Sequence, residues 1–239
     1  MGRVVTFAEL NGSSAGDGVS AAPITVGETK EFAAELIRIA PGKQWSARAP
    51  KGSDCYLFSL TPGAAISSGT GRVPLPAQSF ATVQEGESFA IGNEGTAAVE
   101  IVKVIAPPQA GAGLPGFTGK LQVAERATTP VVPVPEERKQ RIYFVGGHGA
   151  KSDRGHAMIV VYDGQTHTPL HHHPNADSMF VLLDGAVEFT VNDEKVVVTP
   201  GQAACFPAKD RHGLHTAPGY AGASFLEFHI PAAFTTVKE

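Results

Sequence analysis

The sequence predicts an all-β protein made of two copies of one fold, and three observations support that prediction. Charged residues make up only 18% of the 239-residue chain, which contains 27 glycines and 18 prolines; this mixture is typical of many short strands joined by turns. Short apolar runs recur in both halves between turn residues. The two halves also resemble each other. A chain of this length is long enough for two small domains, each with its own core.

The strand pattern is clearest in the second half. Turn pairs such as Asp184-Gly185, Asn192-Asp193 and Pro200-Gly201 separate apolar runs, as in antiparallel hairpins. These runs are Ala157–Tyr162, Met179–Leu183, Ala186–Val191 and Lys195–Thr199. In the first half the corresponding runs are Cys55–Leu60, Ser79–Val83 and Ala97–Ile105. The pattern of Thr29–Ile39 fits a short helix as well as a strand.

A Pro-rich segment, Thr128–Pro135, favours an extended connector over packed structure. We therefore expect a first domain at residues 1–127, a linker at 128–138 and a second domain at 139–239. Shifting the chain by 122 residues superposes Gly42 on Gly164, Phe58 on Phe180, Leu60 on Leu182 and Gly63-Ala64 on Gly185-Ala186. Turn glycines and core positions are those that a duplicated fold retains.

Composition narrows the class of function. A formal net charge of −4 gives no reason to expect nucleic acid or a membrane surface as partner. The first residues lack the basic flank and apolar core of a signal peptide, and no run approaches membrane-spanning length. Two cysteines, Cys55 and Cys205, form no disulfide framework, so a cytoplasmic location is expected. A small molecule is the expected ligand.

Histidines are confined to the second half: all nine lie there, and the first 147 residues contain none. On a strand, His171 and His173 project to the same side and His172 to the other. His212 follows a turn that could return the chain to the same point. These three imidazoles are candidate ligands of a divalent metal; the alternative is three partly buried histidines satisfied by hydrogen bonds.

These segments resemble the two motifs of the cupin family. The first motif runs Gly, five residues, His-x-His, three or four residues, Glu, six residues, Gly; His171, His173 and Gly185 match it, whereas Ser178 stands where Glu is usual. The second motif runs Gly, five residues, Pro-x-Gly, two residues, His. Gly201, Pro207 and His212 match it, with Lys209 in place of its middle glycine. The resemblance implies two tandem cupin barrels of the jelly-roll type, with the metal site in the second.

The departure at Ser178 leaves three neutral histidines, similar to the sites of thiol and diketone dioxygenases in this superfamily and to zinc sites with an open position. Asp177 is the nearest carboxylate, but it lies on the opposite face unless a bulge intervenes. The candidates for catalytic roles are Asp177 and His167. His167 projects from its strand to the same side as His171, but it could also be an ordinary strand residue. Ser178, Phe180 and Leu182 share the inward face as pocket wall or as core.

The first half has no matching ligands. The same shift places Ala49, Lys51 and Tyr56 at the positions of His171, His173 and Ser178, and one extra residue brings Phe89 opposite His212. The first copy is therefore predicted to be metal-free and structural. His229, near the end of the chain, is also predicted to be structural.

Three functional hypotheses follow. The leading one is an iron- or manganese-dependent dioxygenase of a small organic substrate. The second is a redox-neutral isomerase or hydrolase with zinc or nickel as Lewis acid. The third is a non-catalytic binding domain, with a closed site saturated by Asp177 or another protein ligand. Exposed barrel edges would also allow a homodimer.

Overall fold

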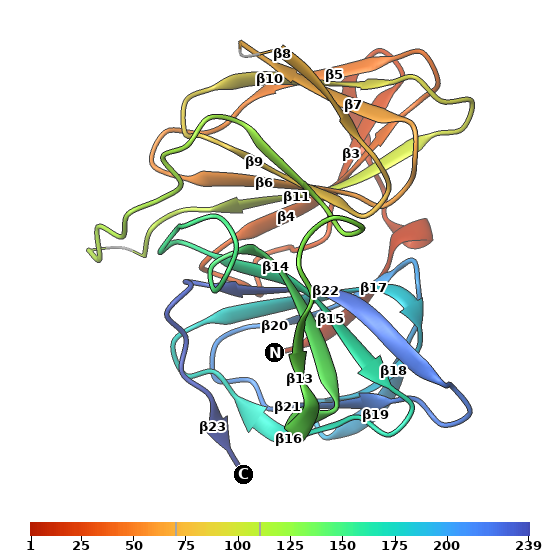
Figure 1. The fold of residues 1–239 in the computed structure, drawn as a ribbon, viewed down its shortest axis with the longest axis vertical. Helices are drawn as coiled ribbons and strands as arrows, with labels where there is room; N and C mark the ends of the chain where they lie inside the picture. The colour runs from red at the N-terminus through yellow and green to blue at the C-terminus, as the bar shows by residue number, and fades with distance from the viewer. Residues whose placement is uncertain (70, 110) are drawn as a thin grey trace.

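The structure, a computed structural model, describes residues 1–69, 71–109 and 111–239, and this part of the chain is almost entirely β-structure (Figure 1). Its only helical elements are two short 3-10 helices, η1 (Phe7–Glu9) and η2 (Pro135–Glu137). No helix in the described ranges is long and apolar enough to cross a membrane. The strands form two jelly-roll barrels that lie one above the other in Figure 1. The predicted all-β, two-barrel architecture is confirmed.

The first barrel consists of a seven-stranded and a four-stranded antiparallel sheet. The larger sheet has the order β12-β9-β6-β11-β4-β3-β2 and the smaller one β5-β10-β7-β8. Thr29–Ile39, which the sequence left undecided, contains strand β4. The strands are β2 (Ser13–Gly16), β3 (Val19–Pro23), β4 (Ala33–Ile39), β5 (Gln44–Arg48), β6 (Asp54–Ser59), β7 (Ala64–Ser68), β8 (Gly71–Leu75), β9 (Ser79–Val83), β10 (Ser88–Asn93), β11 (Val99–Ala106) and β12 (Gln122–Glu125).

The second barrel repeats this plan. Its seven-stranded sheet has the order β1-β20-β17-β22-β15-β14-β13, and its five-stranded sheet β19-β18-β21-β16-β23. The strands are β1 (Arg3–Thr6), β13 (Val132–Val134), β14 (Lys139–Val145), β15 (His156–Asp163), β16 (His167–His172), β17 (Asp177–Gly185), β18 (Val187–Val191), β19 (Glu194–Val198), β20 (Gln202–Phe206), β21 (His212–Thr216), β22 (Gly222–Ile230) and β23 (Val237–Lys238).

Two segments lie elsewhere than the sequence suggested. Residues 3–6, expected in the first domain, form β1 and pair with β20 of the second barrel, so that the amino terminus lies in the lower barrel of Figure 1. In the first barrel the equivalent edge position, beside β9, is taken by β12. Part of the expected linker is also a strand, because β13 pairs with β14. The second barrel therefore contains chain from before and after the first.

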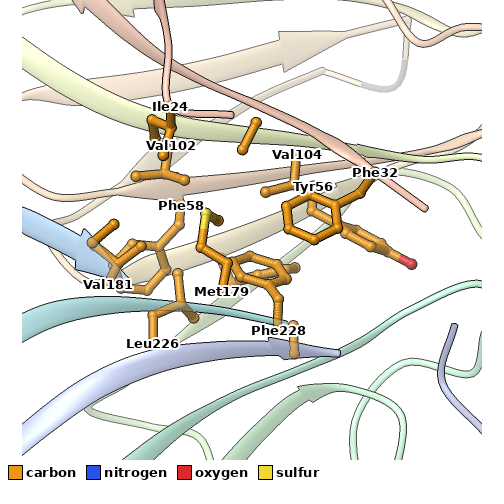
Figure 2. Packing of buried hydrophobic residues seen from close by; sticks show 14 of the residues in the cluster. Ile24, Phe32, Tyr56, Phe58, Val102, Val104, Met179, Val181, Leu226 and Phe228 are labelled. Atoms are coloured by element: carbon orange, nitrogen blue, oxygen red, sulfur yellow. The ribbon is translucent and has the colours of Figure 1, made fainter. Parts of the chain in front are cut away.

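The two larger sheets pack face to face over a shared apolar core, shown in Figure 2. Phe58 and Tyr56 of the first half meet Met179, Val181 and Phe228 of the second. The rings of Tyr56 and Phe228 stack with centroids 6.4 Å apart. Each buried side chain of this size contributes about 1.5–3 kcal/mol, so the shared core holds the barrels together.

Side-chain alternation corrects the alignment of the two halves. On β17, Phe180 belongs to the interior core of the second barrel, whereas Met179 faces the first barrel. On β6, Cys55 lies in the interior of the first barrel, whereas Tyr56 faces the second. A one-residue slip moves every side chain to the other face of a sheet. The predicted equivalence of Tyr56 with Ser178 is therefore wrong by one residue, and Cys55 is the interior counterpart.

Candidate metal centre

The structure brings together the three histidines singled out from the sequence. His171 lies near the end of β16, His173 directly follows this strand, and His212 begins β21. β16 and β21 are antiparallel neighbours, and His171 pairs with His212 in their register. One candidate ligand atom of each imidazole lies within 4.8 Å of the others, and all three residues are buried.

Hydrogen bonds fix the tautomer of each ring. The Nδ1 atom of every one of the three histidines lies within hydrogen-bond distance of a backbone carbonyl, which can only accept. Each Nδ1 therefore carries the proton, and each Nε2 lone pair is free for a metal. The Nε2 atoms of His173 and His212 are buried and have no hydrogen-bond partner within the described ranges. The Nδ1 atom of His171 lies 2.8 Å from the carbonyl oxygen of Pro169. The Nδ1 of His173 lies 3.0 Å from the Thr235 oxygen, and that of His212 lies 3.0 Å from the Asp210 oxygen.

Electrostatics also favour neutral rings. Burial lowers the pKa of His171 and, to about 4, that of His173. The pKa of His212 is lowered well below its usual value, by burial and then by the proximity of His171. Neutral imidazole is the form that binds metal. Three clustered imidazoles, of which two have a buried Nε2 without a partner within the described ranges, fit a divalent transition metal such as iron, manganese, zinc or nickel.

Tight turns bring the ligands into place. Gly185, at the end of the first motif, has φ +68°, and a Cβ added there would lie 2.1 Å from the Gly222 carbonyl oxygen. Lys209 occupies the glycine position of the second motif and has φ +73°, the left-handed region that favours glycine. The Lys209 amide donates to the His173 carbonyl at 2.8 Å. This turn therefore links the two ligand segments directly.

The cluster faces a cavity of about 450 Å³ rather than a closed shell. His171 and His173 form part of its wall, and apolar side chains form another part. Of the three residues predicted as pocket wall or core, Phe180 lines the cavity, Leu182 lies in the barrel core, and Ser178 hydrogen-bonds to His229. The apolar lining residues include Met158, Val160, Phe180, Leu214 and Phe234.

Asp177 lies outside the cluster. Its carboxylate accepts hydrogen bonds from the backbone amides of Lys30, Glu31 and Ala208 at 2.5, 2.8 and 2.7 Å. It therefore connects a loop of the first half to the turn before His212. This is a structural arrangement, and it leaves the carboxylate no place among the metal ligands or catalytic groups that the sequence suggested.

His167 is exposed at the mouth of the cavity, away from the three histidines. Its ring lies 5.9 Å from that of His215, its partner in the register of β16 and β21. A catalytic role for His167 stays a prediction.

Sequence reasoning missed two residues of the cavity, Glu227 and His229. His229 Nε2 lies 2.5 Å from Glu227 Oε1, and His229 Nδ1 lies 2.8 Å from Ser178 Oγ. The His229 ring lies 4.6 Å from that of His173 and stacks on Phe234 at 3.9 Å. Only the Glu-x-His alternation on one face of β22 could have indicated them, since the pairing of His229 with Ser178 depends on strand register.

The Glu227 carboxylate is nearly buried but remains ionised. Burial tends to raise its pKa, but the charge of His229 and the hydrogen bond from it lower the pKa to well below the usual value, with smaller contributions from His156 and Lys139. His156 pairs with His229 in register, and burial lowers the pKa of His156 to about 4. The cavity therefore contains a carboxylate held next to the metal cluster.

The family comparison matches a cupin domain to residues 158–228, the segment that contains all three histidines and Glu227. The second barrel therefore contains a cupin domain, and the resemblance of the chain to the cupin superfamily is supported. No curated protein matches this cupin by sequence. The three-histidine cluster within this fold supports a metal-binding cupin with a divalent metal.

Solved structures similar to this cupin share its fold over nearly the whole chain. A putative glyoxylate-induced protein from Pseudomonas aeruginosa has a TM-score of 0.76 at 15% identity, covering 100% of this chain and 88% of its own. The protein Ylba from E. coli has a TM-score of 0.76 at 11% identity, covering 96% and 90%. An oxalate decarboxylase from Lactobacillus farciminis, in complex with formate, has a TM-score of 0.72 at 12% identity, covering 98% and 88%.

Proposed function

We propose that this cupin is a metal-dependent enzyme that acts on a small organic substrate, with dioxygenase as the leading reaction. One observation carries the proposal: three clustered, buried histidines lie beside a cavity of about 450 Å³, and two of them, His171 and His173, line it. Three protein ligands leave coordination positions for substrate, as in catalytic metal sites, whereas structural sites are closed. A non-catalytic site saturated by Asp177 would need a carboxylate that is engaged elsewhere.

The residues around the cluster suit this role. Met158, Val160 and Phe180 form an apolar surface that would bind a carbon skeleton and exclude water. A divalent iron or manganese at the three histidines would act as a Lewis acid and supply electrons to O₂. Phe234 packs edge-on against His173 at 5.1 Å and limits access of solvent to this ligand.

A redox-neutral isomerase or hydrolase is the second candidate, and Glu227 favours it. A fixed carboxylate in the same cavity can accept and return a proton, which requires no oxidant. Zinc or nickel would serve as Lewis acid in that case.

Metal analysis combined with oxygen uptake tests the proposal. The protein would be purified, its metal content measured, and the metal-free form reconstituted anaerobically with iron, manganese or zinc. Oxygen consumption on a panel of diketones, thiols and phenols, dependent on iron or manganese, supports the dioxygenase. Stoichiometric zinc with oxygen-independent turnover supports the second candidate. The absence of any metal binding beyond that of a His171→Ala, His212→Ala double variant overturns both.

A further inference from the structure

The first cupin motif of this chain lacks its usual glutamate, and the structure shows a carboxylate close to that position on the neighbouring strand. Ser178, at the motif position, pairs with His229 of β22. Glu227, two residues earlier on β22, pairs with Phe180 of β17 and with Met158 of β15. Because alternate residues of a strand share a face, Glu227 and His229 both point into the barrel.

A continuous hydrogen-bond chain connects Ser178, His229 and Glu227. The Glu227 carboxylate can only accept, so His229 Nε2 donates to Oε1 at 2.5 Å. Nδ1 of the same ring shares a hydrogen bond with the Ser178 hydroxyl, 2.8 Å away. Both ring nitrogens of His229 are therefore engaged, and this histidine offers no free lone pair as a fourth metal ligand.

The surroundings hold the Glu227 carboxylate in one orientation. Its side chain is 14% exposed, and Phe234 stacks on His229 at 3.9 Å. Oε1 is occupied by His229 while the carboxylate lines the cavity, which leaves the second oxygen for a substrate. A carboxylate that is held in place and lines the cavity lies where a general base has to lie to reach a bound substrate.

We propose that Glu227 is the catalytic base of this cupin, positioned by His229 and Ser178, and that its substrate carries a C–H bond next to a carbonyl group. This inference rests on the proposed metal-dependent function, because the metal would stabilise the negative charge that develops on the carbonyl oxygen. It assigns the acid–base role to a side chain that does not belong to the three-histidine cluster.

The proposed step is balanced and involves no change of oxidation state. The C–H bond breaks, its proton moves to the free Glu227 oxygen, and its electron pair moves to form the C=C bond of an enolate, with charge on the former carbonyl oxygen. Return of the proton from Glu227 to the same carbon restores the carbonyl group and regenerates the carboxylate, and in D₂O a deuteron is returned in its place.

Anaerobic hydrogen exchange in D₂O tests this step without knowledge of the natural substrate. Zinc-loaded protein would be incubated with 2-oxobutanoate, hydroxyacetone or 3-methyl-2,4-pentanedione, and loss of the C–H signal followed by NMR. We expect the wild-type protein to accelerate exchange of at least one probe. Glu227→Gln should lower this rate by about 100-fold or more, while its zinc affinity, measured by calorimetry, stays within twofold. Glu137→Gln is the matched control, since Glu137 is an exposed carboxylate at the mouth of the same cavity.

Positioning by His229 and Ser178 has a separate readout in the metal-free protein. The buried Nε2 proton of His229 should give a low-field imidazole resonance in the proton NMR spectrum, which moves upfield in Glu227→Gln. Ser178→Ala should lower the exchange rate about tenfold without a change in zinc affinity, and Ser178→Thr should restore it because the hydroxyl is retained. Glu227→Asp provides a second variant if Glu227→Gln does not fold.

Each result decides between the two proposals. Exchange at the wild-type rate in zinc-bound Glu227→Gln overturns the assignment of the base and leaves the metal enzyme intact. Loss of zinc affinity in this variant would make Glu227 a ligand, which also overturns the assignment. Zinc-bound wild-type protein that exchanges none of the probes overturns the substrate class. Failure of the wild-type protein to bind zinc, iron or manganese overturns the proposed function itself.

Discussion

Replacing His212 with phenylalanine should separate metal binding from folding. His212 is 1% exposed, and its ring stacks on Phe206 at 4.4 Å and lies 5.7 Å from that of Phe180. Its Nε2 is buried and has no hydrogen-bond partner in the part of the chain that the structure describes. The side chain therefore sits in an aromatic environment that suits phenylalanine, apart from one hydrogen bond to the Asp210 carbonyl.

Two opposing contributions set the expected magnitude in the metal-free protein. Removing an unsatisfied buried nitrogen gains about 1–3 kcal/mol, and losing the Nδ1 hydrogen bond costs about 0.5–1.5 kcal/mol. His212→Phe should therefore raise the free energy of unfolding by about 1 kcal/mol. With zinc at 100 times the Kd of the wild-type site, the wild type should gain about 2.7 kcal/mol and the variant almost nothing. The order of stability should thus reverse when zinc is added.

Urea unfolding with a chelator and with excess zinc measures both quantities. A Leu214→Met variant provides a control for a conservative change of a cavity residue that has no metal-binding atom in the cluster. Equal stabilisation of His212→Phe and wild type by zinc would refute the ligand role of His212. A metal-free His212→Phe protein that is less stable than wild type by more than about 2 kcal/mol would refute the reasoning about the unsatisfied nitrogen.

Three further predictions concern pH, the interdomain carboxylate and the tail. The metal-free protein should lose stability as the pH falls from about 6.5 to 4, because the unfolded chain takes up protons at His156 and His173 while the fold keeps these rings neutral. Urea unfolding at pH 7 and pH 5 measures this loss, and an unchanged midpoint would contradict the prediction. Asp177→Asn should destabilise the protein by about 1–3 kcal/mol, since one of its oxygens becomes a donor facing backbone amides, with zinc affinity unchanged in calorimetry. Phe234→Ala should speed the release of bound zinc to a chelator, because this ring covers His173 and His229; a release rate equal to that of wild type would show that it does not shield the site.

The histidine cluster was predictable from the sequence because its geometry is local. Alternation along one strand places His171 and His173 on the same side, and the cupin spacing returns the chain to His212. Lys209 adopts the left-handed conformation that the family assigns to glycine. A non-glycine residue at that position did not alter the turn.

Glu227 and the role of Asp177 depended on long-range register, which the sequence does not specify. The position of Glu227 beside the cavity depends on the pairing of β22 with β17 and β15. The same pairing places His229 opposite Ser178. Asp177 was considered as a ligand or catalytic group only because it was the nearest carboxylate, although strand alternation placed it on the opposite face. Its actual partners include the Lys30 amide, from a loop of the other half. The equivalence of Tyr56 with Ser178 was wrong by one residue for a similar reason. Identical residues in two aligned segments do not show which side chains face the interior of each barrel.

The first strand of the chain, β1, forms an edge of the second barrel. This limits how the protein can be cut into fragments and the order in which it can fold. β20 finds its outer neighbour in residues 3–6, which are synthesised before the whole first barrel. A fragment beginning at residue 139 would expose the backbone amides and carbonyls along that edge, a surface prone to aggregation by strand addition. Folding of the nascent chain must likewise keep residues 3–6 unpaired until residues 202–206 are available. The two barrels are therefore interdependent in biogenesis, even though the histidine cluster lies within one of them.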